Sequence, residues 1–258
     1  MNERRDGRAE ILSPVVAARS DVGCVRPNNE DSHGAFTGEW PSQGLLVIVA
    51  DGMGGAAGGE VASRLAVETV RAAYFEATVD PDRRAILRRA LLRANEAIYM
   101  RAAGDPDLTG MGTTCTAVVI LGHAAIFGHV GDSRAYLARR DRITQLTRDH
   151  SLAAELERRC VPGQAVPQAG RHVLTRCLGV ASQVEVDTNE TPIELEPGDH
   201  LLLCSDGLSG PVTAAEMLRA VRELEPQAAC DRLVTLARER GGPDNVTVQI
   251  VRLTLDGR

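Results

Sequence analysis

Segments with helical periodicity occur in consecutive pairs along this chain, and strand-like segments separate the pairs. One predicted pair consists of 60–77 and a helix that opens with Asp80 as N-cap and Pro81 at its first position. The other pair begins at 213–216, which has the capping-box pattern. Strands are predicted at 45–50, over 113–146 as a meander, at 201–204 and at 246–251. This order argues against a parallel βαβ series and predicts an α+β fold, with antiparallel sheets covered by helix pairs.

Apolar positions mark the face that each predicted helix buries. In the helix after Asp80, the buried stripe is expected to be Leu87, Leu91, Ala94 and Ile98. In the helix after the capping box, it is expected to be Met217, Leu218, Val221 and Leu224.

The 258 residues are expected to form one domain over 14–258, preceded by a flexible leader over 1–13. The longest apolar stretches, 44–50 and 115–121, are much shorter than the ~20 residues needed to cross a bilayer. The first residues are charged and lack the apolar centre of a signal peptide. We therefore expect a cytoplasmic protein with no membrane partner.

Composition excludes several classes of function. All 29 basic residues are arginine, so no lysine is present for a P-loop, a Schiff base or a kinase-type phosphate contact. A phosphate held by a basic side chain must therefore be held by Arg, whose planar guanidinium binds it bidentately. The net charge of −6 argues against non-specific nucleic-acid binding. The six cysteines form no CxxC pair, which favours reduced thiols over disulfides or a zinc site.

Two apolar segments far apart in the chain each end in Asp-Gly, at Asp51-Gly52 and at Asp206-Gly207. An aspartate in that position would lie at the rim of a buried sheet. Further acidic residues occur within 29–31, at Glu30 and Asp31, and within 242–245, at Asp244. Oxygen atoms are the ligands that Mg²⁺ and Mn²⁺ prefer. These residues together predict an all-oxygen site for hard divalent cations.

Each of these motifs has a simpler interpretation when it is taken alone. Asp-Gly is a frequent turn dipeptide, Gly131-Asp132-Ser133 suits a hairpin turn, and Arg26 suits an ordinary surface position. The order of the motifs along the chain, compared with that of a known family, distinguishes a metal site from a set of independent turns.

Taken in order, the motifs resemble those of the metal-dependent Ser/Thr protein phosphatases (PPM, or type 2C) in their compact bacterial form. The matching motifs are 21–31, 50–55, 59–63, 111–114, 131–134, 174–176, 205–208 and 244–245. The resemblance covers nearly the whole chain. It implies a four-layer αββα sandwich, in which two antiparallel β-sheets are flanked by pairs of antiparallel helices and the metals lie at one end.

The resemblance also implies roles for single residues around two metals. Asp51 corresponds to the carboxylate that bridges the two ions, and Gly52 to the residue whose backbone carbonyl binds the second ion. Asp206 and Asp244 correspond to the remaining ligands of the first ion.

Three further residues correspond to family positions around the same centre. Glu30 and Asp31 correspond to the acidic pair beside the second ion, partly through water. Asp132 corresponds to a ligand, shared with Asp206, of a third and weaker ion. Arg26 corresponds to the arginine that grips the substrate phosphate.

The family implies Mn²⁺ or Mg²⁺ as cofactor and proteins phosphorylated on serine or threonine as substrates. Two cations ~4 Å apart can activate a bridging water for in-line attack on the phosphoryl group, so no covalent phospho-enzyme is needed. The implied partners are the targets of a Ser/Thr kinase, or that kinase itself. We expect a monomer.

The chain departs from the family pattern at the usual position of a histidine that is the proposed proton donor. Those positions hold Met53 and Ala56. His33 and His129 are the nearest histidines by sequence, and we interpret both as structural. Metal-bound water is then expected to supply the proton.

A second departure concerns the flap region over about 150–173, which is shorter than the bacterial norm. Prolines and glycines leave little room for a long helix beyond about 159, at Pro162, Gly163, Pro167 and Gly170. Substrate preference therefore cannot be carried over from the family.

Two other interpretations of these motifs imply different functions. The segment 52–57 satisfies the dinucleotide fingerprint G-x-G-x-x-A, but a second helix follows where that fold needs a parallel strand with an acidic residue. A catalytically silent relative that only binds phosphoproteins is the other alternative. The complete acidic set argues against it, because silent relatives commonly lose a ligand.

Overall fold

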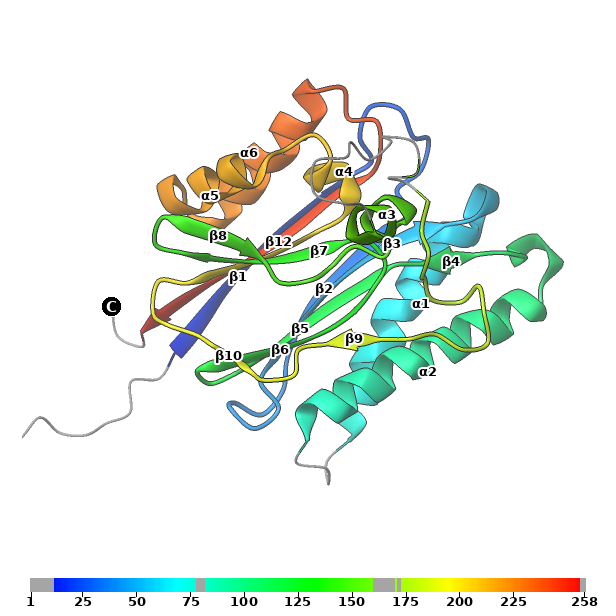
Figure 1. Ribbon diagram of the computed structural model, residues 1–258, viewed down its shortest axis with the longest axis horizontal. Coiled ribbons are helices and arrows are strands. Elements are labelled where there is room, and N and C mark those ends of the chain that lie inside the picture. The colour runs from blue at the N-terminus through cyan, green and yellow to red at the C-terminus, as the bar shows by residue number, and fades with distance from the viewer. Residues whose placement is uncertain (1–11, 78–81, 160–169, 171–172, 256–258) are drawn as a thin grey trace, which may run out of the picture.

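The computed structural model describes residues 12–77, 82–159, 170 and 173–255, which form four layers (Figure 1). Two β-sheets pack face to face in the middle. Helices α1 (Gly55–Glu76) and α2 (Arg83–Ala103) cover the outer face of one sheet. Helices α5 (Ala214–Glu223) and α6 (Pro226–Glu239) cover the outer face of the other. The predicted αββα sandwich is confirmed.

Both sheets are antiparallel throughout the described residues. The sheet beside α5 and α6 consists, in spatial order, of β1 (Leu12–Asp21), β12 (Val246–Leu255), β11 (His200–Cys204), β7 (Arg134–Arg139) and β8 (Arg142–Gln145). The sheet beside α1 and α2 consists of β10 (Ile193–Glu194), β6 (Ala124–Val130), β5 (Cys115–Leu121), β3 (Leu45–Met53) and β2 (Asp31–Thr37). Two short strands extend it, because β4 (Gly112–Thr113) pairs with β3 and β9 (Asp187–Thr188) pairs with β6.

Strand β3 is apolar at every position of its first half because it is buried on both faces. Leu46 and Ile48 pack toward α1 and α2, whereas Leu45 and Val47 pack toward the second sheet. Successive side chains of a strand point to opposite faces, so a strand between two apolar layers needs an apolar residue at each position. The continuous run before Asp51 is the sequence signal of this central location.

The first helix pair begins at other residues than the sequence predicts. Helix α1 starts at Gly55 rather than at 60. Helix α2 is capped by Asp82, whose carboxylate accepts the backbone N–H groups of Arg84 and Ala85 at 3.1 Å. Asp82 therefore replaces Asp80 as the N-cap, and the expected Pro81 position lies outside the described residues. The expected buried stripe of α2 is correct.

The capping box opens α5 as predicted. The Thr213 side chain accepts the Glu216 backbone N–H, and the Glu216 carboxylate accepts the Thr213 backbone N–H at 3.0 Å. Met217 and Val221 are buried as expected. Leu224 is 38% exposed instead, because α5 ends at Glu223 and Leu224 has extended backbone.

The first described strand begins earlier than the expected domain boundary at 14. Leu12 is fully buried and pairs with Leu255, since β1 aligns along the whole length of β12. The end of the expected leader is thus part of a strand, and residues 1–11 lie outside the described part of the chain.

Remaining short elements are a 3₁₀ turn over Pro106–Leu108, α3 (Leu152–Arg159) and α4 (Asp206–Ser209). Across the described ranges, no helix has both the length and the apolar character that a membrane span requires. The cysteines in those ranges are all free thiols, as expected, while Cys160 lies outside them.

Candidate metal centre

The acidic residues singled out in the sequence meet at one end of the sandwich, where both sheets contribute. Asp31 on β2 lies directly opposite Asp51 on β3 in the strand register. Asp206 follows β11 at the first position of α4, and Asp244 comes just before β12. The Ser205 hydroxyl donates to Asp31 Oδ2 at 2.8 Å, which joins the two sheets at this end.

Close backbone approach brings Asp206 and Asp244 together. A Cβ added to Gly207 would lie 1.9 Å from the backbone oxygen of Asn245, so no side chain fits there. The glycine of the second Asp-Gly motif therefore lets α4 pack directly against the chain segment that carries Asp244. At the other motif, a Cβ added to Gly52 would lie 2.1 Å from the Gly59 carbonyl oxygen. Gly59 in turn leaves room for the Glu30 carboxylate, which is 2.4 Å from its added Cβ position.

Asn245 organises the loop that carries Arg26 and Glu30. Its side-chain oxygen accepts the Glu30 backbone N–H at 2.8 Å, and its amide donates to the carbonyls of Val22 and Asn28 at 3.0 and 2.9 Å. Asn245 is almost fully buried. The sequence places it beside Asp244 in a matching motif but does not indicate this role, because its partners lie more than 200 residues away.

The carboxylates are held close together in a poorly solvated place. Burial, and then the charges of Asp206 and Asp244, raise the pKa of Asp31 to about 7, although the Ser205 and Thr247 hydrogen bonds lower it. Burial followed by the charge of Asp206 raises the pKa of Asp132 to about 7. Burial and four neighbouring aspartates, Asp31 foremost, hold the pKa of Asp51 well above its ordinary value. Like charges gathered this way are costly unless a cation or a proton neutralises them.

These residues fit a hydrated hard cation. Asp31 Oδ1 is buried and has no hydrogen-bond partner among the described residues, so one carboxylate oxygen is left for another ligand. Within those residues, no three His, Cys, Asp or Glu side chains lie close enough to enclose an ion by themselves. Mg²⁺ and Mn²⁺ do not need such a cage, because one or two carboxylates and several waters suffice for Mg²⁺. The oxygen-only donor set matches that chemistry.

Arg26 lies at the rim of this carboxylate cluster. Its Nη2 donates to Asp244 Oδ2 at 2.8 Å, and this hydrogen bond raises the pKa of the guanidinium. The Arg26 side chain is 53% exposed. The guanidinium is therefore at the site, on its solvent side, where a phosphate group would approach.

The two histidines considered from the sequence are both hydrogen-bonded within the protein. His33 Nδ1 lies 2.9 Å from Gln249 Nε2, which donates to it. His129 is fully buried, with Nε2 2.9 Å from the Arg148 carbonyl and Nδ1 2.9 Å from Thr116 Oγ1. Burial lowers the pKa of His129 to about 4. Both contacts agree with a structural role for these side chains.

Within the flap region, α3 ends at Arg159, three residues before Pro162. The predicted absence of a long helix beyond about 159 falls on residues outside the described part.

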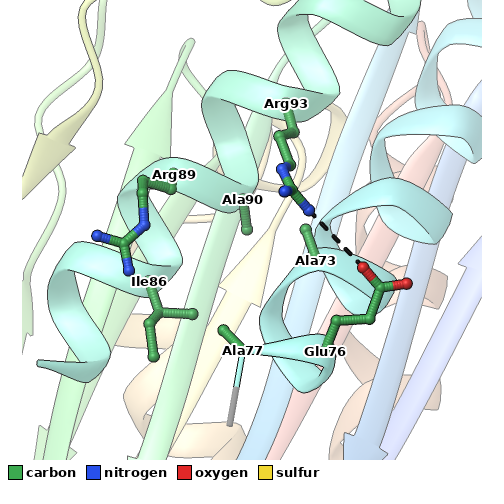
Figure 2. Close-up of a pocket in the computed structure, with 7 residues that line it drawn as sticks. All are labelled: Ala73, Glu76, Ala77, Ile86, Arg89, Ala90 and Arg93. Atoms are coloured by element: carbon green, nitrogen blue, oxygen red, sulfur yellow. Dashed lines mark ion pairs between the residues drawn. The ribbon is translucent and has the colours of Figure 1, made fainter. Parts of the chain in front are cut away.

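A hollow of about 280 Å³ between α1 and α2 is separate from the metal centre (Figure 2). Ala73, Ile86 and Ala90 line it, and the ion pair between Arg93 and Glu76, at 3.7 Å, spans one side. Ala73 is 18 residues along α1 from Gly55, roughly 27 Å at the helical rise. None of the candidate ligands lines this hollow.

Comparison with known proteins identifies the family. The family model described as "Protein phosphatase 2C" matches residues 26–244. The serine/threonine phosphatase stp of Listeria innocua is 40% identical over 245 residues, covering 92% of this chain and 95% of that protein. The serine/threonine protein phosphatase PstP of Mycobacterium tuberculosis is 42% identical over 236 residues, covering 91% of this chain and 44% of PstP.

A solved structure extends the likeness to the backbone. The crystal structure of the catalytic domain of PstP in complex with two manganese ions has a TM-score of 0.80 and 40% sequence identity, and the match covers 94% of this chain and 99% of that one. The family motifs, the αββα sandwich and the carboxylate cluster all agree with these comparisons. The chain therefore belongs to the protein phosphatase 2C family.

Proposed function

We propose that this protein is a manganese- or magnesium-dependent protein phosphatase that hydrolyses phosphoserine and phosphothreonine. The observation that carries the proposal is the meeting of Asp31, Asp51, Asp206 and Asp244 at one end of the sandwich, with an unpartnered buried oxygen on Asp31. Membership of the family and the two manganese ions in the PstP structure support it.

We assign the candidate ligands as the family pattern suggests. Asp51 would bridge two ions, and the Gly52 carbonyl would bind the second. Asp206 and Asp244 would complete the protein ligands of the first ion. Glu30 and Asp31 would serve the second ion, partly through water, and Asp132 would hold a third ion with Asp206. When bound, the cations supply positive charge that offsets these carboxylates and stabilises an in-line displacement at phosphorus.

The side chains around this centre bind and orient the substrate and the ligands. Arg26 would take the phosphate in its planar fork, since its guanidinium lies at the exposed rim and already contacts Asp244. Ser205 fixes the rotation of the Asp31 carboxylate through its 2.8 Å hydrogen bond. Thr114 holds Asp51 from behind, because its Oγ1 accepts the Asp51 N–H at 2.9 Å and its N–H donates to the Asp51 carbonyl at 2.8 Å.

The direct test is release of phosphate from p-nitrophenyl phosphate as Mn²⁺ or Mg²⁺ is added. We expect activity that EDTA and Asp206→Asn abolish, and a preference for phosphoserine and phosphothreonine peptides over phosphotyrosine peptides. A protein that stays inactive over a range of both metals, yet binds phosphopeptides, would instead be a silent phosphoprotein-binding module.

We further propose a monomer that acts in the cytoplasm on the targets of a partner Ser/Thr kinase, or on the kinase itself. The net charge of −6 argues against non-specific binding of nucleic acid. Light scattering during gel filtration tests the monomer, and dephosphorylation of autophosphorylated kinases from the same organism tests the partner.

A further inference from the structure

His150 contacts one end of the turn that presents Asp132. Its ring Nδ1 accepts the Gly131 backbone N–H at 3.0 Å, and its own backbone N–H donates to the Gly131 carbonyl at 2.7 Å. The His150 side chain is 1% exposed, so water cannot readily replace the ring as an acceptor. One residue thus holds both polar backbone groups of Gly131.

The opposite end of the same turn is joined to the bridging carboxylate. Ser133 Oγ lies 2.7 Å from Thr114 Oγ1, which accepts the Asp51 backbone N–H at 2.9 Å. Gly131 has φ +113°, and an added Cβ would lie 2.5 Å from the Thr114 side chain. Asp132 therefore sits between two anchors, one through Ser133 to Asp51 and one through Gly131 to His150.

A second layer of contacts sets the orientation of the His150 ring. Because Nδ1 accepts a hydrogen bond, the proton of the neutral ring lies on Nε2, which donates to Asp187 Oδ2 at 3.1 Å. The other oxygen of Asp187 accepts from Arg176 Nη1 at 2.7 Å. The ring also packs on that of His129, with centroids 4.7 Å apart. Partners of this kind commonly fix the geometry of metal ligands from behind.

We propose that His150 is a positioning residue that holds the Gly131-Asp132 turn so that Asp132 can bind its cation. This inference rests on the proposed function, because it concerns the third ion of that site. It assigns a role to a histidine whose side chain is 1% exposed, and it assigns the Asp187 and Arg176 side chains to the support of that histidine.

Two conservative variants separate the two hydrogen bonds of the ring. In His150→Asn, the amide oxygen occupies approximately the place of Nδ1 and can accept from Gly131, but the side chain does not reach Asp187. In His150→Gln, the amide reaches Asp187 but offers no acceptor at Gly131. His150→Ala loses both bonds. His200→Gln is the matched control, because His200 is the first residue of β11 and Asp206 follows the opposite end of that strand.

Mn²⁺ binding is measured by electron paramagnetic resonance, which reports the free aqueous ion and needs no turnover. One bound Mn²⁺ is defined as the ion whose binding is lost in Asp132→Ala. We expect His150→Gln and His150→Ala to weaken the binding of that ion by about two- to tenfold, the effect of one lost hydrogen bond. His150→Asn should stay within about twofold of the wild type, and His200→Gln should match it. In an Asp132→Ala background, His150→Ala should add no further loss.

Two results would overturn the proposal. One is an equal loss of Mn²⁺ affinity in His150→Asn and His150→Ala. The other is a loss of Mn²⁺ affinity that His150→Ala still causes in the Asp132→Ala background. Circular dichroism melting of each variant identifies misfolding, and the Asn and Gln variants keep the test valid if the Ala variant does not fold. A wild type that binds Mn²⁺ but releases no phosphate would refute the phosphatase activity while leaving the role of His150 open to this measurement.

Discussion

At the scale of single residues, the centre combines buried carboxylates that repel one another with one exposed guanidinium. The pKa values of Asp31 and Asp132 are raised to about 7, so the folded protein without metal retains protons on these side chains that the unfolded chain releases. Arg26 contacts the outer side of the cluster, at Asp244. The protonation of the buried carboxylates is therefore expected to make stability depend on pH. Arg26 is placed to meet an anion that approaches from solvent.

The raised pKa values predict how the stability of the protein in EDTA depends on pH. The ordinary aspartate pKa is 3.8, so these groups stabilise the fold fully below about pH 4 and lose that contribution as pH rises through about 7. The free energy of unfolding in urea should thus fall between pH 5 and pH 8. Asp31→Asn should flatten the profile, and equal slopes for variant and wild type would contradict the assignment.

Arg26→Ala is expected to lower kcat/KM for a phosphopeptide by roughly 10- to 100-fold, as one or two charge-assisted hydrogen bonds to phosphate are lost. Arg26→Lys should recover only part of this, because an ammonium does not offer the planar fork. The Tm should change little, since the Arg26 side chain is 53% exposed. Arg219→Ala on α5, with a side chain 76% exposed, is the control and should retain activity.

At the scale of elements, the site depends on how closely chain segments approach one another. Helix α4 begins at Asp206 and packs against the segment before β12 at Gly207. The strand register sets Asp31 opposite Asp51. The positions of the carboxylates thus follow from backbone packing that an added methyl group would disturb.

Gly207→Ala should push α4 away from Asn245, because the new Cβ would lie 1.9 Å from the backbone oxygen of that residue. We expect a loss of about 1–3 kcal/mol in stability and weaker Mn²⁺ binding, since Asp206 and Asp244 move apart. Gly104→Ala, whose added Cβ would be 3.5 Å from its nearest neighbour, is the control. Thermal melting and Mn²⁺ titration measure both effects, and normal Mn²⁺ binding in Gly207→Ala would contradict this account.

At the scale of the whole molecule, the ligands come from both sheets, so a bound cation would join the two halves of the sandwich. Asp31 and Asp51 belong to the sheet beside α1 and α2, whereas Asp206 and Asp244 adjoin strands of the other sheet. The hydrogen bond from Ser205 to Asp31 is one direct protein link between the two sheets at the site.

Mn²⁺ should therefore raise the Tm of the whole domain in one cooperative transition. A concentration one hundred times the Kd stabilises the folded state by about 2.7 kcal/mol, roughly 5–10 °C for a domain of this size. EDTA should reverse the shift, and Asp51→Asn should reduce it sharply. A second transition that does not respond to metal would show that the two sheets unfold separately.

The sequence by itself determined the fold class and the identity of the acidic residues. The helix pairs, the continuous apolar strands and the Asp51-Gly52 and Asp206-Gly207 motifs can each be recognised in a short segment of sequence. Local propensity and burial are enough to turn such segments into helices, strands and turns. Only the tertiary structure decided which groups support those carboxylates. Ser205 contacts Asp31 from 174 residues away, Asn245 contacts Glu30 from 215 residues away, and His150 contacts Gly131 from 19 residues away, beyond strands β7 and β8. Such contacts depend on sheet order and register, which no short segment of sequence encodes.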